Sequence, residues 1–180
     1  HRVERVRDDD HERVRAVLLR AVRHALDRVR RISTAQKSDS FFGTDVTYED
    51  LERQRASDFA LGPLQREERA GKPVLVIPAT PRRPQNYERA HFVLAADEDV
   101  MLESHYFKRG SKTPWRVIYS PREHMQVLSG HLLPTQLLVD NLDRHTRTEV
   151  WFRDLRVGVA LPDKVFSVGN LESQGPIPGS

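Results

Sequence analysis

From residue 73 onward, short runs of alternating apolar and polar residues are separated by turn-forming residues. The segment 73–81, PVLVIPATP, is typical of a strand that ends at prolines. Residues 87–128 predict three or four antiparallel strands, and residues 132–158 predict two more. The expected turns are rich in acids, Gly, Ser, Pro and Asn, and they lie at 96–99, 109–112, 120–123 and 141–145. Strands at this spacing, without long helices between them, predict an antiparallel sheet rather than an α/β fold.

The first third of the chain contains two competing patterns. Alternation on both sides of an Asp-rich tetrapeptide predicts a hairpin of Val3–Arg7 and Arg13–Leu19 that turns at Asp8–His11. Apolar residues from Val14 to Ile32 also recur at helical spacing, with arginines on the other face, and this favours a basic amphipathic helix over 13–32.

Helical signals elsewhere are short. Thr47 is typical of an N-cap because acids follow it in the first turn, so we expect a helix from Tyr48 to about Arg55. A polar helix or loop is expected over Gly62–Ala70, and a final helical turn over Leu161–Ser167. So little helix leaves a large sheet partly uncovered, unless the sheet curls on itself. A strongly curved sheet of this kind would hold an apolar ligand.

Composition narrows the function classes. The 180 residues are 38% hydrophobic and 31% charged, which suits a folded domain, and no run of apolar residues is long enough to span a membrane. The absence of cysteine excludes disulfides, thiol catalysis and cysteine zinc sites. The net charge of +3 fits phosphate-bearing partners such as nucleic acid or anionic lipid, and it equally fits an arginine-rich proteome.

Motifs for catalysis are missing. The four histidines on neighbouring predicted strands suggest a metal, but no HExxH or His-x-His spacing accompanies them, so solvated strand histidines are the better interpretation. No nucleophile elbow, dinucleotide fingerprint or phosphate loop is present. We therefore expect no enzyme, cofactor or metal site. The histidines considered are His91, His105, His124 and His131.

The stretch SFFGTDVTYEDLE, which follows DRVRRIS after a short polar link, resembles bacterial outer-membrane lipoprotein-sorting proteins, the LolA-like group. Later segments resemble the same family in order: Tyr87 after a proline-rich link, Tyr106–Gly110, Pro134–Asn141, and Thr146–Gly158 followed by LPDKVFSVGNLE. The resemblance covers residues 27–172 and is most specific in the Gly-Thr-Asp segment. The residues of the signature are Phe42, Gly43, Thr44, Asp45, Tyr48, Glu49, Asp50 and Leu51.

The resemblance implies a mainly β fold, in which a strongly curved antiparallel sheet forms an incomplete barrel closed by a few helices over an apolar cavity. It implies a single domain over 1–172, with a flexible tail at 173–180, and a monomeric periplasmic carrier. The cargo would be lipid or lipoprotein, passed from an inner-membrane export pump towards an outer-membrane acceptor. Family geometry also implies that residues 13–32 form strands rather than a helix, and the segment before Asp27 is shorter than in the family. The chain begins at His1 without a visible signal peptide, so we expect it to be processed or truncated.

In such a carrier the apolar faces of the strands would line the cavity, although ordinary core packing explains each residue equally well. Arginines at the rim, namely Arg28, Arg30 and Arg116, would meet an anionic headgroup or simply be solvated. The alternatives are a basic β-rich nucleic-acid-binding module and an envelope module for protein docking whose sheet is filled by its own helices. The predicted lining residues are Phe92, Leu94, Leu102, Tyr106, Trp115, Val117, Tyr119, Leu138, Val150 and Phe152.

Overall fold

The computed structural model describes residues 36–52, 54–98 and 100–167, which fall into two compact units. The smaller unit contains residues 36–42, 47–52 and 159–167, and the larger contains the rest. The predictions of strands over 13–32, of rim positions for Arg28 and Arg30, and of a flexible tail at 173–180 lie outside the described residues. The single domain over 1–172 stays a prediction.

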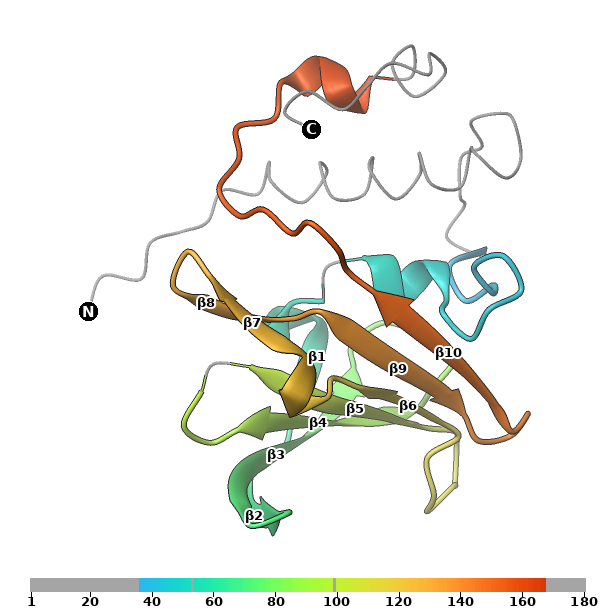
Figure 1. Ribbon diagram of the computed structural model, residues 1–180. Coiled ribbons are helices and arrows are strands. Elements are labelled where there is room, and N and C mark those ends of the chain that lie inside the picture. Colours follow the sequence, from blue (N-terminus) through green and yellow to red (C-terminus); the bar gives the residue numbers. More distant parts are fainter. Residues whose placement is uncertain (1–35, 53, 99, 168–180) are drawn as a thin grey trace. The chain divides into compact units, whose positions relative to one another are not determined.

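An eight-stranded antiparallel sheet forms the larger unit (Figure 1). The strand order is β1-β3-β4-β5-β6-β9-β10, and β2 pairs with β3 beside β1. In the described residues the sheet is open, because β10 pairs only with β9. The mainly β, antiparallel prediction is therefore confirmed, and the strands after residue 73 lie near their expected places, except that residues 131–151 form three strands rather than the two expected. The strands are β1 Phe59–Leu61, β2 Gln65–Arg69, β3 Lys72–Pro81, β4 Arg89–Ala95, β5 Met101–Phe107, β6 Arg116–Tyr119, β9 Gln136–Asn141 and β10 Thr146–Trp151, with a separate hairpin of β7 Met125–Leu128 and β8 His131–Pro134.

The two faces of the sheet each bury an apolar cluster. Successive residues of a strand point to opposite faces, and directly paired residues share a face. We name the faces after the adjacent β4 residues Phe92 and Val93. The Phe92 face holds a cluster of Phe59, Ala79, Tyr87, Ala90, Phe92 and Tyr106. The Val93 face holds Val74, Val76, Val93, Ala95, Val100 and Leu102, against which Met125 and Leu132 of the β7–β8 hairpin pack.

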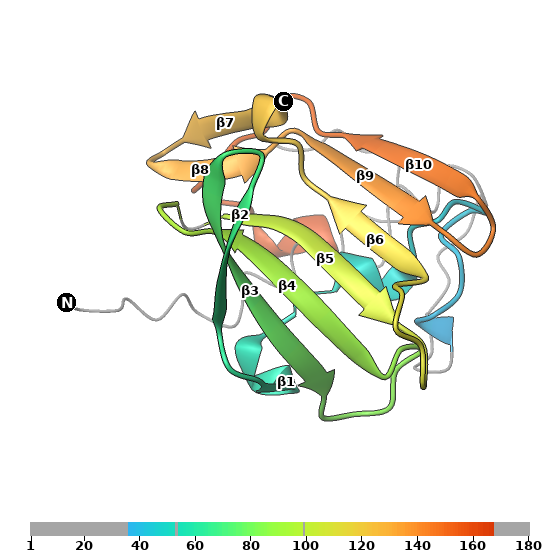
Figure 2. The ribbon, with the colours of Figure 1, turned by 90° about the horizontal axis from the view of Figure 1, so that it is seen from below.

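The β2–β3 hairpin folds over the sheet. Its two-residue turn, Ala70-Gly71, has positive φ at both residues, the geometry that best matches the twist of paired strands. On a flat sheet β2 and β5 would be separated by about 14 Å, three strand spacings. Arg69 of β2 nevertheless contacts Glu103 of β5 at 2.6 Å, because β3 is strongly bent and β2 crosses in front of β4 and β5 when seen from below (Figure 2).

The described helices are single turns of 3-10 type: η2 Tyr48–Leu51, η3 Ala56–Asp58, η4 Arg122–His124 and η5 Asp163–Phe166. The predicted helix from Tyr48 to about Arg55 is wrong in length, because the chain is extended again at Glu52. The prediction for Gly62–Ala70 is also wrong, because β2 occupies it. The final helical turn is confirmed as η5. Within the described residues, no helix has the length and apolar character needed to cross a membrane.

The start of η2 follows the predicted capping pattern, and Asp50 of its first turn supplies an accepting side chain. The carboxylate of Asp50 accepts hydrogen bonds from both the backbone N–H and the hydroxyl of Thr47, at 2.7 and 2.8 Å. In the same unit, the ring of Phe41 makes edge contacts with Phe42 and Tyr48. The adjoining Gly43 has a φ of +76°, which explains why a glycine stands there.

Candidate ligand-binding face

The Phe92 face contains a ladder of directly paired residues that crosses six strands. Ile77 of β3 pairs with Phe92, which pairs with Ser104 of β5. The next partners are Ile118 of β6, Val139 of β9 and Thr148 of β10. Cross-strand neighbours are close enough for side-chain contact, so the ladder forms a continuous band with small polar residues only at Ser104 and Thr148.

Several aliphatic side chains of this face are only half-buried. They come from five strands, and two pairs lie directly opposite each other in the register. Apolar side chains that remain partly accessible on adjacent strands can contact an alkyl chain without any new desolvation of polar groups. The half-buried residues are Leu75, Ile77, Leu94, Ile118, Leu137 and Val150.

The signature residue Asp45 closes one end of the Phe92 face over β10. Its carboxylate oxygens accept hydrogen bonds from the hydroxyls of Thr146 at 2.7 Å and Thr148 at 3.1 Å. Its backbone N–H donates to the Thr148 hydroxyl at 2.9 Å. Because Asp45 is only 8% exposed, these hydrogen bonds replace its lost hydration and hold the segment 43–46 against the strand.

Arg116 lies in the same part of the larger unit. The sequence interpretation of a solvated rim arginine is wrong, because Arg116 is 4% exposed. Its Nε donates to the backbone carbonyl of Asp45 at 3.2 Å, and its guanidinium lies 5.5 Å from the ring centroid of Tyr106. The physical reason is register. Arg116 pairs with Tyr106 and Asn141 on the Phe92 face, so β6 points its first side chain inward.

The register divides the predicted lining residues between the two faces. Phe92, Leu94, Tyr106 and Val150 lie on the Phe92 face, and Trp115 packs against its cluster. Phe152 follows β10 and is 38% exposed. The residues found on the other face are Leu102, Val117, Tyr119 and Leu138.

Two structural causes explain this division. An irregularity in the β4–β5 register between Val93 and Leu94 leaves Leu102 as an extra residue, and Leu102 joins the Val93 cluster. In β6 the aromatic and apolar content favours Val117 and Tyr119 as the inner residues. Their partners on β5 are His105 and Glu103, so both belong to the Val93 face. The predicted set therefore cannot line a single face, and ligand contact stays a prediction for its members.

Sequence reasoning missed several residues of the Phe92 face. Phe59 contacts Phe92 with ring centroids 5.2 Å apart, although its strand has only three residues. Ile118 and Leu137 were visible as alternating apolar residues, but the sequence contains nothing that shows which phase of β6 and β9 matches that of β4. Only the pairing supplies this information.

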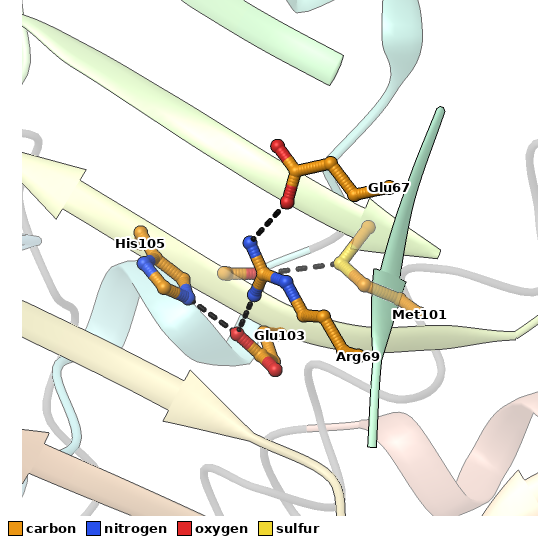
Figure 3. A network of polar contacts seen from close by, with 6 residues as sticks. Glu67, Arg69, Met101, Glu103 and His105 are labelled. Atoms are coloured by element: carbon orange, nitrogen blue, oxygen red, sulfur yellow. Dashed lines mark hydrogen bonds and ion pairs between the residues drawn. The ribbon is translucent and has the colours of Figure 1, made fainter. Parts of the chain in front are cut away.

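The Val93 face carries a polar network beyond its apolar cluster (Figure 3). One carboxylate oxygen of Glu103 contacts Nη1 of Arg69 at 2.6 Å and Nε2 of His105 at 2.5 Å. Arg69 also pairs with Glu67 at 3.2 Å. The hydrogen bond from His105, with help from Arg69, lowers the pKa of Glu103 even though burial opposes the charge. The network fastens the folded hairpin to β5.

His91 stands directly opposite His105 in the β4–β5 register. Burial lowers the pKa of His91 below its ordinary value of 6.5, and the positive charge of Arg89 and the nearby His105 act in the same direction. The side chain also packs against Phe107, with ring centroids 4.7 Å apart. No cluster of three potential metal ligands occurs among the described residues.

These shifts predict that acid destabilises the fold in two steps. A lowered histidine pKa means that protonation favours the unfolded chain, so stability falls as the pH drops below 6.5. A lowered glutamate pKa means that stability present above 4.5 is lost as the pH falls through the folded value. Urea unfolding across this range should show that His91→Gln removes the first step and Glu103→Gln the second. The exposed His131→Gln controls for the loss of one histidine, and an unchanged profile in both variants would contradict the assignment.

Comparison with known proteins places the chain in a family. A family model described as an uncharacterized protein matches residues 23–173. The chain belongs to this family. No curated protein sequence matches it.

Solved structures identify the fold of this family member as LolA-like, which confirms the resemblance. An outer membrane lipoprotein-sorting protein domain from Vibrio parahaemolyticus matches with a TM-score of 0.74 and 24% identity over 83% of the chain. A DUF1329 family protein from Desulfovibrio piger matches with a TM-score of 0.73 and 24% identity over 82%. A LolA superfamily protein from Nitrosomonas europaea matches with a TM-score of 0.56 and 16% identity over 73% of the chain. The chain spans 63%, 61% and 59% of their respective lengths.

Proposed function

We propose that this protein is a carrier that holds an acyl chain, or a similarly elongated hydrophobic molecule, against the Phe92 face. The observation that carries the proposal is the band of half-buried aliphatic side chains from β3 to β10. The LolA-like fold supports it, since one solved structure of this fold is described as a putative outer membrane lipoprotein-sorting protein domain. The ligand is a lipid, or the acyl chains of a lipoprotein.

The energetic basis is transfer of methylene groups from water to the sheet. Each buried methylene contributes about 0.8 kcal/mol, so partial burial of a few methylenes gives useful but reversible affinity. Reversibility matters because a carrier must release its cargo to an acceptor that offers similar burial. The protein carries its ligand unchanged, without enzymatic chemistry, metal or cofactor.

The same fold supports a cellular setting that we also propose. We place the protein in the periplasm as a monomer that receives cargo from an inner-membrane export pump and delivers it towards the outer membrane. Curvature of the sheet into an incomplete barrel would enclose the cargo more fully than a flat sheet.

A nucleic-acid-binding role receives less support. Stacking on bases needs exposed aromatic rings, whereas the rings of Phe92 and Tyr106 within the Phe92 face are only 7% and 3% exposed. Three basic side chains of the larger unit, Arg69, Arg122 and Arg147, are ion-paired with acids rather than gathered in a basic patch.

Native mass spectrometry of gently purified protein tests the proposal. We expect additional masses that disappear after extraction with organic solvent, and lipids in the extract. The extracted protein should then bind a fluorescent fatty acid, and unlabelled fatty acid should displace it. Protein that is purified empty and binds no probe would overturn the proposal.

A further inference from the structure

The indole N–H of Trp115 is a buried donor that has no hydrogen-bond partner among the described residues. Enclosing a donor without a partner costs about 1–3 kcal/mol, so such groups in native proteins call for an explanation. The other tryptophan, Trp151, is half-exposed, and its indole N–H lies 3.4 Å from a carboxylate oxygen of Glu149.

The position of Trp115 is fixed by its backbone. Its N–H donates to the carbonyl of Tyr106 at 3.0 Å, and its carbonyl accepts from the N–H of Leu142 at 2.8 Å. Its ring packs against the apolar cluster of the Phe92 face. The Trp115 ring therefore lies beside the band on which we place the alkyl chain.

A cation lies over the same ring. The ammonium of Lys108 is 5.2 Å from the ring centroid of Trp115, and it pairs with the carboxylate of Asp143. Lys108 and Asp143 are both about half-exposed. An apolar band, a donor without an acceptor and an exposed cation are thus found together near the start of β6. This set of groups matches an amphiphile with an oxygen at its head.

We propose that Trp115 recognises the headgroup oxygen of the bound molecule, so that the ligand is an acyl compound whose carboxylate or ester carbonyl accepts from Nε1. This inference rests on the proposed function and adds the class of ligand to it. The shared chemistry is an sp² oxygen at the end of an alkyl chain. A free fatty acid and an acyl ester both supply it.

Three amphiphiles with the same chain separate the possibilities. Dodecanoate has an anionic acceptor, methyl dodecanoate has a neutral acceptor, and dodecyltrimethylammonium has none. Binding of each is measured to the intact chain, to Trp115→Phe and to the control Trp151→Phe. Phenylalanine keeps an aromatic ring in place and removes the donor, and thermal unfolding checks that both variants fold.

We expect Trp115→Phe to weaken dodecanoate and methyl dodecanoate about fivefold, the usual net contribution of one hydrogen bond. Dodecyltrimethylammonium should change less than twofold, and Trp151→Phe should change none of the three. A larger loss for dodecanoate than for the ester identifies a free acid as the source, and equal losses identify an acyl ester.

Nuclear magnetic resonance gives a readout that does not depend on the variants' stability. The chain has two tryptophans, so its ¹H–¹⁵N spectrum contains two indole signals. The Trp115 indole proton should move downfield with either acceptor and not with the ammonium compound. Binding of all three without that movement, or equal weakening of all three by Trp115→Phe, would overturn this inference alone. Binding of none would overturn the proposed function, and this inference with it.

Discussion

Leu137→Glu is expected to weaken binding of a fluorescent fatty acid at least tenfold, while Leu138→Glu leaves it nearly unchanged. The two leucines are neighbours in β9 and are both half-buried. Leu137 pairs with Val150 on the Phe92 face, whereas Leu138 pairs with Tyr119 and Glu149 on the Val93 face. Because the substitutions share residue type, strand and burial, they differ only in the face that receives the carboxylate.

The expected loss follows from two unfavourable terms. The carboxylate removes apolar contact worth about 0.8 kcal/mol per methylene, and it must lose hydration when an alkyl chain covers it. A tenfold weakening needs only about 1.4 kcal/mol, so the estimate is a lower bound. Probe fluorescence gives the affinity, and circular dichroism shows that each variant is folded. Equal losses in both variants would exclude the Phe92 face as the binding surface, and the reverse order would assign binding to the Val93 face.

Asp45→Ala is expected to lower the free energy of unfolding by about 2–4 kcal/mol, because hydrogen bonds to a charged group are among the stronger ones. The substitution removes the acceptor for the hydroxyls of Thr146 and Thr148, at a site where water has little access. It also weakens the attachment of the segment 43–46 to the sheet, although the backbone contacts of residue 45 to Thr148 and Arg116 remain. The free energy of unfolding of Asp45→Asn should lie between those of the unchanged protein and Asp45→Ala, since the amide keeps one acceptor oxygen.

The matched control is Asp140→Ala. Asp140 also has a carboxylate with two hydrogen bonds, both from Arg147, and they hold its pKa below the ordinary value. That pair is at the surface, where water replaces a lost partner, so little stability should be lost. Urea unfolding at neutral pH measures both. Similar urea unfolding midpoints for the two variants would show that the hydrogen bonds of Asp45 do not stabilise the fold as its contacts indicate.

Much of the sheet was predictable because alternation has a strong local cause. In β4, β5 and β9 at least one face is buried, and in β10 Thr148 and Val150 are half-buried on one face, so the polarity of successive residues follows the pleat. β2 has the sequence QREER and shows no such alternation. It is a strand because the tight turn at Ala70-Gly71 returns it to β3 and because Arg69 binds Glu103, a contact between residues far apart in sequence.

The signature segment was recognisable from its sequence, but the structural role of each residue in it was not. Acids after Thr47 predict a helix cap, and the Asp50 carboxylate does accept a hydrogen bond from the backbone N–H of Thr47. Asp45 looks the same in sequence, yet it belongs to the other unit and binds threonines about a hundred residues later in the chain. Neighbouring residues alone are enough to predict the contact between Thr47 and Asp50. The contacts of Asp45 with Thr146 and Thr148 form only once β10 has paired with β9.

The sequence alone thus determined the antiparallel class, the strands of the second half and the LolA-like resemblance, since each depends on local pattern. It also showed that each strand predicted after residue 87 has an apolar face. The tertiary structure decided which of these faces meet. Side chains alternate with a period of two, so one extra residue at Leu102 or one shift of register in β6 moves a side chain to the other face. Pairing between distant strands sets that phase, and with it the residues that can contact a ligand.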